Sequence, residues 1–520
     1  MRTISPLAVA SGVLLCCLAA AALADEPTKT WKFVSMPDFL NVDLAYPQKG
    51  WEEALDYVLK AVKAEDPDFL LVAGDLVMGR WTYGDKGVAH WANVYYPAWK
   101  KRMADHGLKY YACLGDHEMG DDPWPPGSEK HKAIGQFKKA FCDHIKMPLN
   151  GPEHMKGTAW SMVHKGVLFV AVDVFEPDEK LGIAAKVTGR QLAWVDKTLA
   201  GRKGIQHVVV MGHTPIVGPV RRWSSSGLML EGGRGSPLWQ TMSRRGADLY
   251  LCGEVHDMTC NQRDGVQEIA HGGLFGYNSR VNYMVATVSP GKMTLELKEI
   301  NIVCEGPKLW QVGRNRPRQR VSITEAVRKR GFVSVGRMVV DKTGTTRVMR
   351  GKTGRFDEAN SPRGVTAVPA PTDLTHAVLD IRAGAKLAPG AKRKAWQPQA
   401  DNVIVRKNGF AYTVRGPTFR GQAGDAWGGG AVELTITCPK AFAGRLLVNF
   451  STPAGRGNRR MPGAAAFTLD ARRHFFMGPS GRGVWGQFNI TPAQSADGRI
   501  VLKMTMKGAA ISRIALIPAR

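Results

Sequence analysis

Apolar runs that end abruptly in a polar residue recur through the first 260 residues of the chain. Six such runs lie at residues 31–36, 69–73, 110–114, 167–172, 207–211 and 249–252. Continuous apolar runs of this length predict strands that are buried on both faces. Between them, the apolar positions of 51–62 follow a helical period, and 130–145 and 189–200 also favour helices. Strands that alternate with helices predict an α/β domain with a largely parallel or mixed sheet.

The pattern changes after about residue 300. Residues 306–372 are rich in Arg and Lys with scattered Gly, and we interpret them as a basic linker or a small β module. Short alternating segments then recur between turns, at residues 403–405, 432–436, 446–450, 500–504 and 511–516. They predict an all-β sandwich, jelly-roll-like, over 373–520. The α/β domain is therefore expected at 25–305, and the sandwich is expected to be an accessory domain.

Charge separates the same two parts of the chain. The 520 residues carry a formal net charge of +26, and +25 of it lies in residues 301–520, whereas 11 of the 13 His precede residue 300. The basic part could bind nucleic acid, an anionic cell-surface polymer or acidic lipid head groups, although a generally solvated basic surface is the leading interpretation. The C-terminal sandwich looks like a carbohydrate-binding accessory module, so carbohydrate is a further candidate partner. Nucleic acid is the least accessible of these partners to an exported protein.

The N-terminus has the features of a secretory signal peptide. A positive residue, Arg2, precedes an apolar run over 7–23, and Ala22-Leu23-Ala24 is a small-x-small cleavage site. Cleavage is expected after Ala24, which predicts a secreted or periplasmic protein, with an uncleaved membrane anchor as the alternative. No later apolar run reaches about 20 residues, so we expect no integral membrane segment after cleavage. Cys252 and Cys260 are interpreted either as a disulfide pair or as buried free thiols.

The polar residues at the run ends are of the types that bind metal ions. Ligand sites of α/β sheets form beyond the carboxyl ends of the strands, where these residues are expected to converge. Carboxylates can bridge two cations, imidazoles can complete their coordination, and a water between the cations can become a nucleophile. The alternative for each Asp is a turn or helix-cap residue, and for each His a buried core residue.

Five segments carry a family resemblance. They are Asp38, Gly74-Asp75, Gly115-Asp116-His117-Glu118, Gly212-His213-Thr214-Pro215 and Gly253-Glu254-Val255-His256. In this order they resemble the motifs of the calcineurin-like metallophosphoesterase superfamily, including its purple acid phosphatase-like branch. The resemblance covers about residues 30–300. It implies a two-sheet sandwich flanked by helices and an exported, metal-dependent phosphoester hydrolase.

The resemblance also implies a role for each motif residue. Asp38 and His256 would bind a first metal ion, and Asp75 would bridge two ions. Asp116, His213 and Glu254 would complete the second site. The two ions would be divalent Mn, Mg, Zn or Fe, and a water or hydroxide that they hold would attack the phosphorus of the phosphoester substrate. His117 would assist by contacting the phosphate or protonating the leaving group.

Three motifs depart from the family pattern. Leu40 replaces a His of the first motif, and Met78 stands where purple acid phosphatases supply a Tyr. Asp116 replaces an Asn, and Glu254 replaces a His. The added carboxylates nearly neutralise two divalent ions, which weakens phosphate attraction and favours harder ions such as Mn or Mg. A working site with altered metal preference, a one-metal site and a site without catalysis all remain open.

Further residues are candidates for an additional ligand or a substrate contact. Asn41 or Asp43 could fill the position left by Leu40, and His271 is either an extra ligand or a structural residue. Arg221 and Arg222 either bind substrate phosphate or form a solvated turn. The alternative function is a catalytically degenerate domain that acts as a binding protein beside a carbohydrate-binding-like sandwich.

Overall fold

The computed structural model describes residues 30–519 with internal gaps. The gaps are residues 39–47, 79, 202–203, 219, 221–224, 274–279, 307–319, 342–346, 355–365, 369–370, 372, 383–401, 406–408, 416–417, 422–423, 429–430, 452–462, 470–471, 479–483 and 505–509. The expected signal peptide and four of the candidate site residues, Asn41, Asp43, Arg221 and Arg222, lie outside the described residues.

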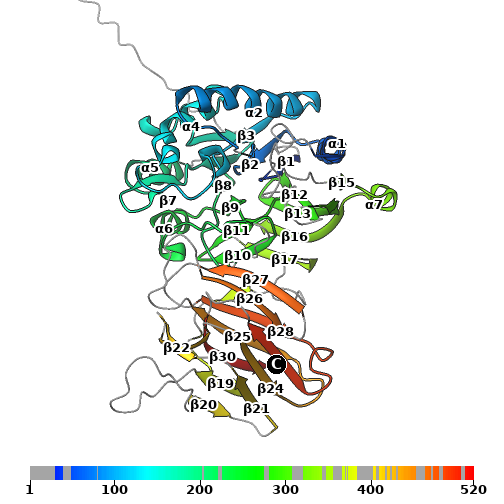
Figure 1. Ribbon diagram of the computed structural model, residues 1–520. Helices are drawn as coiled ribbons and strands as arrows, with labels where there is room; N and C mark the ends of the chain where they lie inside the picture. Colours follow the sequence, from blue (N-terminus) through cyan, green and yellow to red (C-terminus); the bar gives the residue numbers. More distant parts are fainter. Residues whose placement is uncertain are drawn as a thin grey trace, which may run out of the picture.

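Two mixed sheets form the centre of the first domain (Figure 1). The seven-stranded sheet has the order β17-β16-β13-β12-β1-β2-β3. Its strands are β1 (Trp31–Ser35), β2 (Phe69–Val72), β3 (Tyr110–Ala112), β12 (Arg280–Ser289), β13 (Lys292–Asn301), β16 (Val333–Asp341) and β17 (Arg347–Gly354). The six-stranded sheet has the order β10-β11-β9-β8-β5-β4. Its strands are β4 (Trp160–His164), β5 (Val167–Ala171), β8 (His207–Met211), β9 (Leu249–Cys252), β10 (Thr259–Arg263) and β11 (Val266–Ala270).

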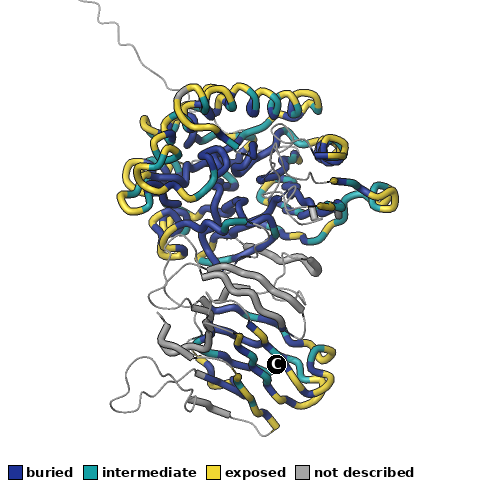
Figure 2. Tube along the Cα trace, viewed as in Figure 1, coloured by how far each residue is buried: buried dark blue, intermediate teal, exposed yellow. Residues whose placement is uncertain are grey.

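The six predicted strands are all present, and they pair as their apolar composition suggests. β1, β2 and β3 are parallel neighbours, and so are β5, β8 and β9. Strands from both sheets contribute to one continuous buried apolar cluster (Figure 2). The carboxyl ends of the parallel strands therefore present their polar residues at one edge of each sheet.

Helices cover the outer faces of the sheets (Figure 1). They are α1 (Trp51–Ala64), α2 (Asp85–Asp105), α3 (Glu129–Lys132), α4 (Ile134–Ile145), α5 (Gly189–Ala200), α6 (Pro237–Arg244) and α7 (Glu325–Arg330). Short 3-10 helices are η1 (His117–Met119), η2 (Glu153–Met155) and η3 (Gly233–Gly235). Two further sheets have two strands each: β6 (Phe175–Asp178) pairs with β7 (Gly182–Ala185), and β14 (Val303–Glu305) pairs with β15 (Arg320–Ser322). The three predicted helices are confirmed as α1, α3–α4 and α5, whereas α2 was not predicted.

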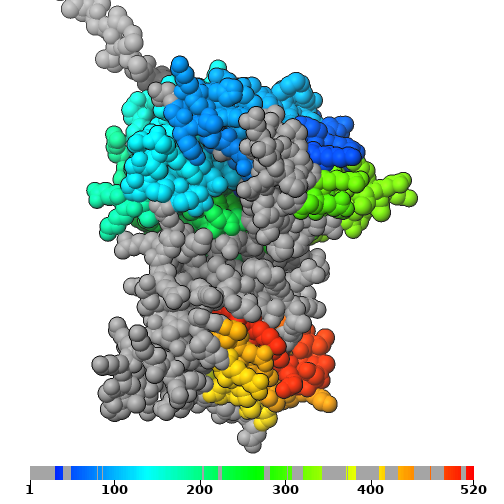
Figure 3. Space-filling model, viewed as in Figure 1, coloured from blue at the N-terminus to red at the C-terminus, as the bar shows by residue number. Residues whose placement is uncertain are grey.

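The first sheet extends beyond the boundary expected at residue 305. β16 pairs antiparallel with β13, and β17 pairs with β16, so this part of 306–372 belongs to the sheet and is not a linker. α7 lies beside α1, where the hydroxyl of Tyr57 donates to the carbonyl of Arg328 at 3.0 Å. Figure 3 shows the two helices in contact at the surface. Strand β16 exposes Arg337 and buries the apolar side chains of Met338 and Val340.

Two antiparallel sheets make up the C-terminal part, below the first domain in Figure 1. The larger sheet contains β18 (Thr366–Val368), β19 (Leu379–Arg382), β20 (Asn402–Val405), β22 (Thr418–Gly421), β23 (Gly424–Gly428), β25 (Gly444–Ser451), β28 (Val484–Ile490) and β30 (Ala510–Pro518). The smaller contains β21 (Ala411–Arg415), β24 (Val432–Thr437), β26 (Gly463–Leu469), β27 (Arg472–Gly478) and β29 (Arg499–Met504). Alternate residues of both sheets share one apolar core, as the period-two pattern predicted.

Two smaller expectations can be compared with the structure. Cys252 and Cys260 are free, buried thiols, so the interpretation as a disulfide pair is wrong. Their pairing across the sheet is prevented because β9 and β10 lie on opposite sides of β11. Among the described helices, none has the length and apolar content needed to cross a membrane.

Candidate metal centre

Most of the predicted ligands follow a strand directly, and several do so in an unusual backbone conformation. Asp38, Asp75, Glu254 and His256 have positive φ angles of 58°, 60°, 69° and 51°. Residues with a side chain adopt this left-handed region rarely, and each instance costs on the order of 1 kcal/mol. The surrounding fold therefore holds these four side chains in place at the ends of their strands.

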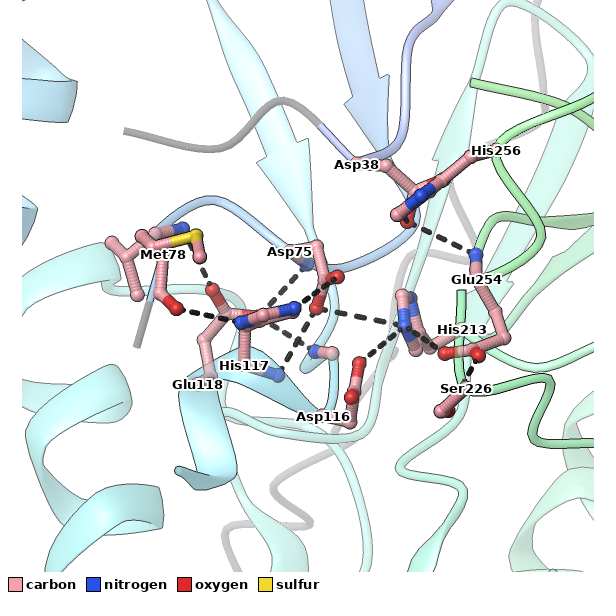
Figure 4. A network of polar contacts seen from close by, with 12 residues as sticks. Asp38, Asp75, Met78, Asp116, His117, Glu118, His213, Ser226, Glu254 and His256 are labelled. Atoms are coloured by element: carbon pink, nitrogen blue, oxygen red, sulfur yellow. Dashed lines mark hydrogen bonds and ion pairs between the residues drawn. The ribbon is translucent and has the colours of Figure 1, made fainter. Parts of the chain in front are cut away.

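The imidazole of His213 lies at the centre of the cluster (Figure 4). Its Nδ1 lies 2.7 Å from the carbonyl oxygen of Ala73. A carbonyl can only accept, so Nδ1 carries the proton and Nε2 is directed at the carboxylates. Nε2 lies 3.0 Å from Asp116 Oδ1 and 3.5 Å from Asp75 Oδ1. It also lies 3.4 Å from Glu254 Oε2, so three strand ends meet at one ring nitrogen.

Asp38 and His256 lie side by side at the other end of the cluster (Figure 4). His256 Nε2 is 4.0 Å from Asp38 Oδ1, and the same oxygen accepts the backbone N–H of Glu254 at 3.0 Å. The second oxygen, Asp38 Oδ2, is buried and has no hydrogen-bond partner among the described residues. A buried carboxylate oxygen without a partner is costly unless a cation approaches it.

Burial and mutual repulsion shift the pKa values of these carboxyl groups in the absence of a cation. Burial raises the pKa of Asp38 to about 7, although His213 opposes the shift. Burial and the charge of Asp116 raise the pKa of Asp75 well above its usual value. Burial also acts on Asp116, but His117 and His213 outweigh it and hold the pKa of Asp116 far below its usual value. A divalent cation between these groups would favour their ionised forms.

Three combinations of the predicted residues could each hold a metal ion. In each, one ligand atom per residue lies within 4.8 Å of the others. The combinations are Asp38 with Asp75 and His213, Asp75 with Asp116 and His117, and Asp116 with His213 and Glu254. The last one comprises three of the four residues expected around the second metal ion. His256 contacts Asp38 but is not part of a three-residue group among the described residues.

The side chain of His117 lies between the carboxylate of Asp75 and the backbone of Met78. Its Nδ1 donates to the carbonyl oxygen of Met78 at 2.6 Å, and its Nε2 is 3.8 Å from Asp75 Oδ2. Burial lowers the pKa of His117, but Asp116, Asp121 and the Met78 hydrogen bond outweigh this effect and raise it overall. The ring can therefore carry a proton toward the centre. Met78 holds His117 through its backbone carbonyl.

Glu118, for which the sequence suggested no role, joins two of the ligand loops. Its Oε1 accepts the N–H groups of Leu76 and Val77 at 2.8 and 3.1 Å. Its Oε2 accepts those of Asp75 and Gly115 at 2.9 and 2.7 Å. Burial raises the pKa of Glu118, whereas these four donors favour its ionised form. One buried carboxylate thus ties the loop of Asp75 to the loop of Asp116.

Close packing and a second carboxylate hold the loop of His213. Gly74 has a φ of +88°, and a Cβ there would lie 2.5 Å from His213 Nδ1, so only glycine fits. Beyond His213, the Oε2 of Glu268 accepts the N–H groups of Ile216 and Val217 at 2.6 and 2.9 Å. Burial raises the pKa of Glu268 to about 7.

Further polar residues at the centre were not predicted from the sequence. The Oε1 of Glu254 accepts from the hydroxyl of Ser226 and from the N–H of Leu228, at 2.9 and 3.0 Å. The carboxylates of Asp121 and Asp122 approach Asp116 to within 4.8 Å. Burial raises the pKa of Asp121 to about 6 and that of Asp122 to about 7. The signal for the two Asp residues was their position just after the third motif.

His271 lies outside these metal groups among the described residues. It is fully buried, and its Nε2 is 2.9 Å from the hydroxyl oxygen of Ser35. Burial lowers the pKa of His271 to about 3, which keeps the ring neutral. This environment agrees with a structural residue that joins β1 to β11. Four aromatic residues that follow the second motif, Trp81, Tyr95, Tyr96 and Trp99, are buried in the core.

The sequence was also compared with known proteins. Residues 43–258 match the model of the calcineurin-like phosphoesterase family. The match supports a calcineurin-like phosphoesterase domain at residues 43–258. The matched range contains Asp75, Asp116, His213, Glu254 and His256, and it begins after Asp38. A search of curated proteins found no match. The more specific purple acid phosphatase branch stays a prediction.

Solved structures similar to this chain include GAP50, the anchor in the inner membrane complex of Plasmodium. It is 14% identical, with 52% of this chain and 84% of that chain covered at a TM-score of 0.34. A Staphylococcus aureus protein, provisionally classed as a 5′-nucleotidase and solved with alpha-ketoglutarate, is 10% identical, covers 58% of each chain and has a TM-score of 0.32. Vacuolar protein sorting 29 from Cryptosporidium parvum is 11% identical, with 59% of this chain and 98% of that chain covered at a TM-score of 0.24.

Proposed function

We propose that this protein is a metal-dependent phosphoester hydrolase whose reaction takes place at the cluster around His213. The observation that carries the proposal is the approach of Asp75, Asp116 and Glu254 to one imidazole nitrogen, at 3.5, 3.0 and 3.4 Å. Carboxylates this close repel one another unless cations lie between them. The match of residues 43–258 to the calcineurin-like phosphoesterase family supports the same reaction class.

The donor set fits two divalent ions rich in oxygen ligands. Asp38 and Asp75 would hold one ion, with His256 close to Asp38, and Asp116, Glu254 and His213 would hold the other. Oxygen donors in this proportion favour Mn or Mg over softer ions. When bound, divalent ions would polarise the phosphoester and lower the pKa of a water molecule.

The chain itself would orient the substrate and move a proton. His117, with Nδ1 fixed by Met78, presents Nε2 toward Asp75 and can donate a proton to the leaving oxygen. Glu118 holds the Asp75 loop and the Asp116 loop at a constant separation, which preserves the geometry on which the reaction depends.

The proposal is tested with the full chain, stripped by a chelator and reconstituted separately with Mn, Mg, Zn or Fe. Hydrolysis of p-nitrophenyl phosphate and bis-p-nitrophenyl phosphate would report monoesterase and diesterase activity. We expect Asp75→Asn to lower turnover by about 100-fold or more, since even outer-shell changes cost 10–100-fold. Asp143→Asn, at an exposed position of α4, is the matched control and should match the unsubstituted protein. No turnover with any metal would overturn the proposal, as would full activity in Asp75→Asn.

The alternative, a binding protein with a degenerate domain, is not favoured because the candidate ligands still converge. Metal content separates the two functions. Purified protein expressed with added metal should contain bound ions, and Asp75→Asn should contain fewer. Near-zero metal in the unsubstituted protein would support the binding protein instead.

Export and polymer binding remain proposals for the two ends of the chain. N-terminal sequencing of the purified protein should find a chain that begins at Asp25. Binding of a carbohydrate or an anionic polymer by the basic C-terminal part would weaken in high salt if charge dominates it. Binding that persists in high salt would argue against the electrostatic explanation.

A further inference from the structure

Glu254 is held through one of its two carboxylate oxygens. Its Oε1 accepts three hydrogen bonds, from the hydroxyl of Ser226 at 2.9 Å and from the backbone N–H groups of Gly227 and Leu228 at 2.8 and 3.0 Å. A carboxylate oxygen has about two lone pairs, so three donors saturate Oε1. The other oxygen, Oε2, lies 3.4 Å from His213 Nε2 and faces the candidate metal centre (Figure 4).

The backbone of Glu254 is fixed as well. Its N–H donates to Asp38 Oδ1 at 3.0 Å, its φ of 69° lies in the left-handed region, and the residue is 3% exposed. A turn of the carboxylate that brought Oε1 to the centre would break the three hydrogen bonds that this oxygen accepts. Glu254 therefore presents Oε2 to an ion beside Asp116 and His213.

The segment that carries the three donors is anchored independently of Glu254. The N–H of Leu230 donates to the carbonyl of Pro215, and the N–H of Glu231 donates to the carbonyl of Ala185, both at 2.8 Å. The φ of Gly227 is 84°, and a left-handed residue between two N–H groups lets both point to one side, as in anion-binding backbone nests. These contacts place the donors without the need for a bound ion.

This arrangement limits the contact points and the charge that Glu254 offers. An unrestrained carboxylate would offer a metal ion two oxygens and a full negative charge. Beside Asp75 and Asp116, a full charge would add to the repulsion between carboxylates. With Oε1 saturated, Glu254 offers one oxygen, and the three donors offset part of its charge.

We infer that residues 226–228 form a positioning loop that holds Glu254 as a one-oxygen ligand of the second metal ion. The inference rests on the proposed metal-dependent function, in which Asp116, His213 and Glu254 hold that ion. Loss of a donor should weaken the binding of this ion and spare the ion at Asp38 and Asp75. Ser226 is the member of the positioning loop that a substitution can change, because the other two donors are backbone groups.

The test titrates the chelator-treated full chain with Mn and measures binding by calorimetry, so it needs no turnover. We expect two Mn sites in the unsubstituted protein, and Ser226→Ala should weaken one of them by about tenfold, as outer-shell changes do. Ser226→Thr keeps the hydroxyl and should restore most of the affinity. Ser225→Ala is the matched control, because the neighbouring hydroxyl is buried and has no hydrogen-bond partner among the described residues.

Glu254→Gln tests the orientation that the positioning loop imposes. Held by the loop, the amide oxygen should stay with the three donors and turn the NH₂ group toward the ion, so one Mn site should be lost. Without that restraint, the amide would turn its oxygen to the ion and keep part of the affinity. Retention of both Mn sites in Glu254→Gln would therefore overturn the inference.

A double substitution separates Glu254 from a second neighbour of Ser226. The Ser226 hydroxyl also forms a hydrogen bond with the carboxyl group of Asp122. In the Asp122→Ala background, Ser226→Ala should still weaken one Mn site by about tenfold, since its effect passes through Glu254. Loss of the effect in this background would assign it to Asp122 and overturn the inference.

The outcomes distinguish the inference from the function on which it rests. Two Mn sites with the same affinities in Ser226→Ala and Ser225→Ala would overturn the inference and leave the function standing. Equal weakening of both sites by Ser226→Ala would also overturn it, because the positioning loop would then support the whole centre. If the unsubstituted protein bound no Mn, the metal centre and the proposed function would be removed together.

Discussion

Replacement of Glu118 by Gln tests whether one carboxylate holds the metal loops together. The two oxygens of Glu118 each accept two backbone N–H groups, at distances between 2.7 and 3.1 Å. In Gln, the oxygen still accepts two of them, but the amide NH₂ faces the other two donors. Each hydrogen bond to a charged acceptor contributes roughly 1.5 kcal/mol or more, so two lost bonds cost about 3 kcal/mol.

Scanning calorimetry of the full chain would measure this loss. For a domain of this size a destabilisation of 1 kcal/mol lowers Tm by roughly 2–4 °C, so the transition of the first domain should fall by about 6 °C or more. Its affinity for Mn should fall as well, because the loops of Asp75 and Asp116 would no longer be tied together. Glu153→Gln is the control, since Glu153 forms only an exposed ion pair with Lys156. A Tm within 1 °C of the unsubstituted protein would refute the reasoning.

Three further substitutions probe other parts of the molecule. Gly74→Ala would place a Cβ 2.5 Å from His213 Nδ1, so bound metal measured by mass spectrometry should fall, and full metal content would contradict this packing argument. Because burial raises the pKa of Glu268 from 4.5 to about 7, the folded state holds a proton that the unfolded state has lost, and stability should fall by up to about 3 kcal/mol as the pH rises from 4.5 to 7. The free energy of unfolding, measured between pH 4.5 and 7, should fall with pH in the unsubstituted protein and should lose this fall in Glu268→Gln. The same pH dependence in both proteins would contradict the role of Glu268. Asp380→Asn should lower the free energy of unfolding of the C-terminal part by about 3 kcal/mol without changing phosphoester turnover. The reason is that Arg513 binds the buried Asp380 carboxylate at 2.8 and 2.6 Å. A loss below about 0.5 kcal/mol would show that the pair is dispensable.

Local patterns were enough to predict the strands and the residues at their ends. A buried strand such as β2 must be apolar throughout, so the first polar residue after it, Asp75 in this case, stands out in the sequence. Parallel pairing then brings such residues together within each sheet, Asp75 with Asp116 and His213 with Glu254, and the packing of the two sheets brings the two groups together. The resemblance to a family added the order and the roles of the motifs, which the pattern alone left open.

The features that were not predicted depend on contacts between distant segments. Helix α2 contains Pro97 and lacks a clear apolar period, so its helical state depends on packing against α4. The membership of β16 in the first sheet depends on pairing with β13, and nothing in its basic composition indicates that partner. Likewise, Ser226 reaches Glu254 only because the chain folds back over 28 residues. Such placements are tertiary and leave little local signal.

The continuation of the first sheet through β16 limits where the chain can be divided. A shortened protein that ended at residue 305, where the composition changes, would lose two strands and leave residues 292–299 of β13 unpaired along one side. The side chains of Met293, Leu295 and Leu297 are fully buried in the intact sheet. The exposed edge strand would therefore be long, apolar and prone to self-association. A catalytic fragment intended to stand alone would therefore have to keep the chain through Gly354, and exchange of the C-terminal part between proteins would have to begin beyond that point.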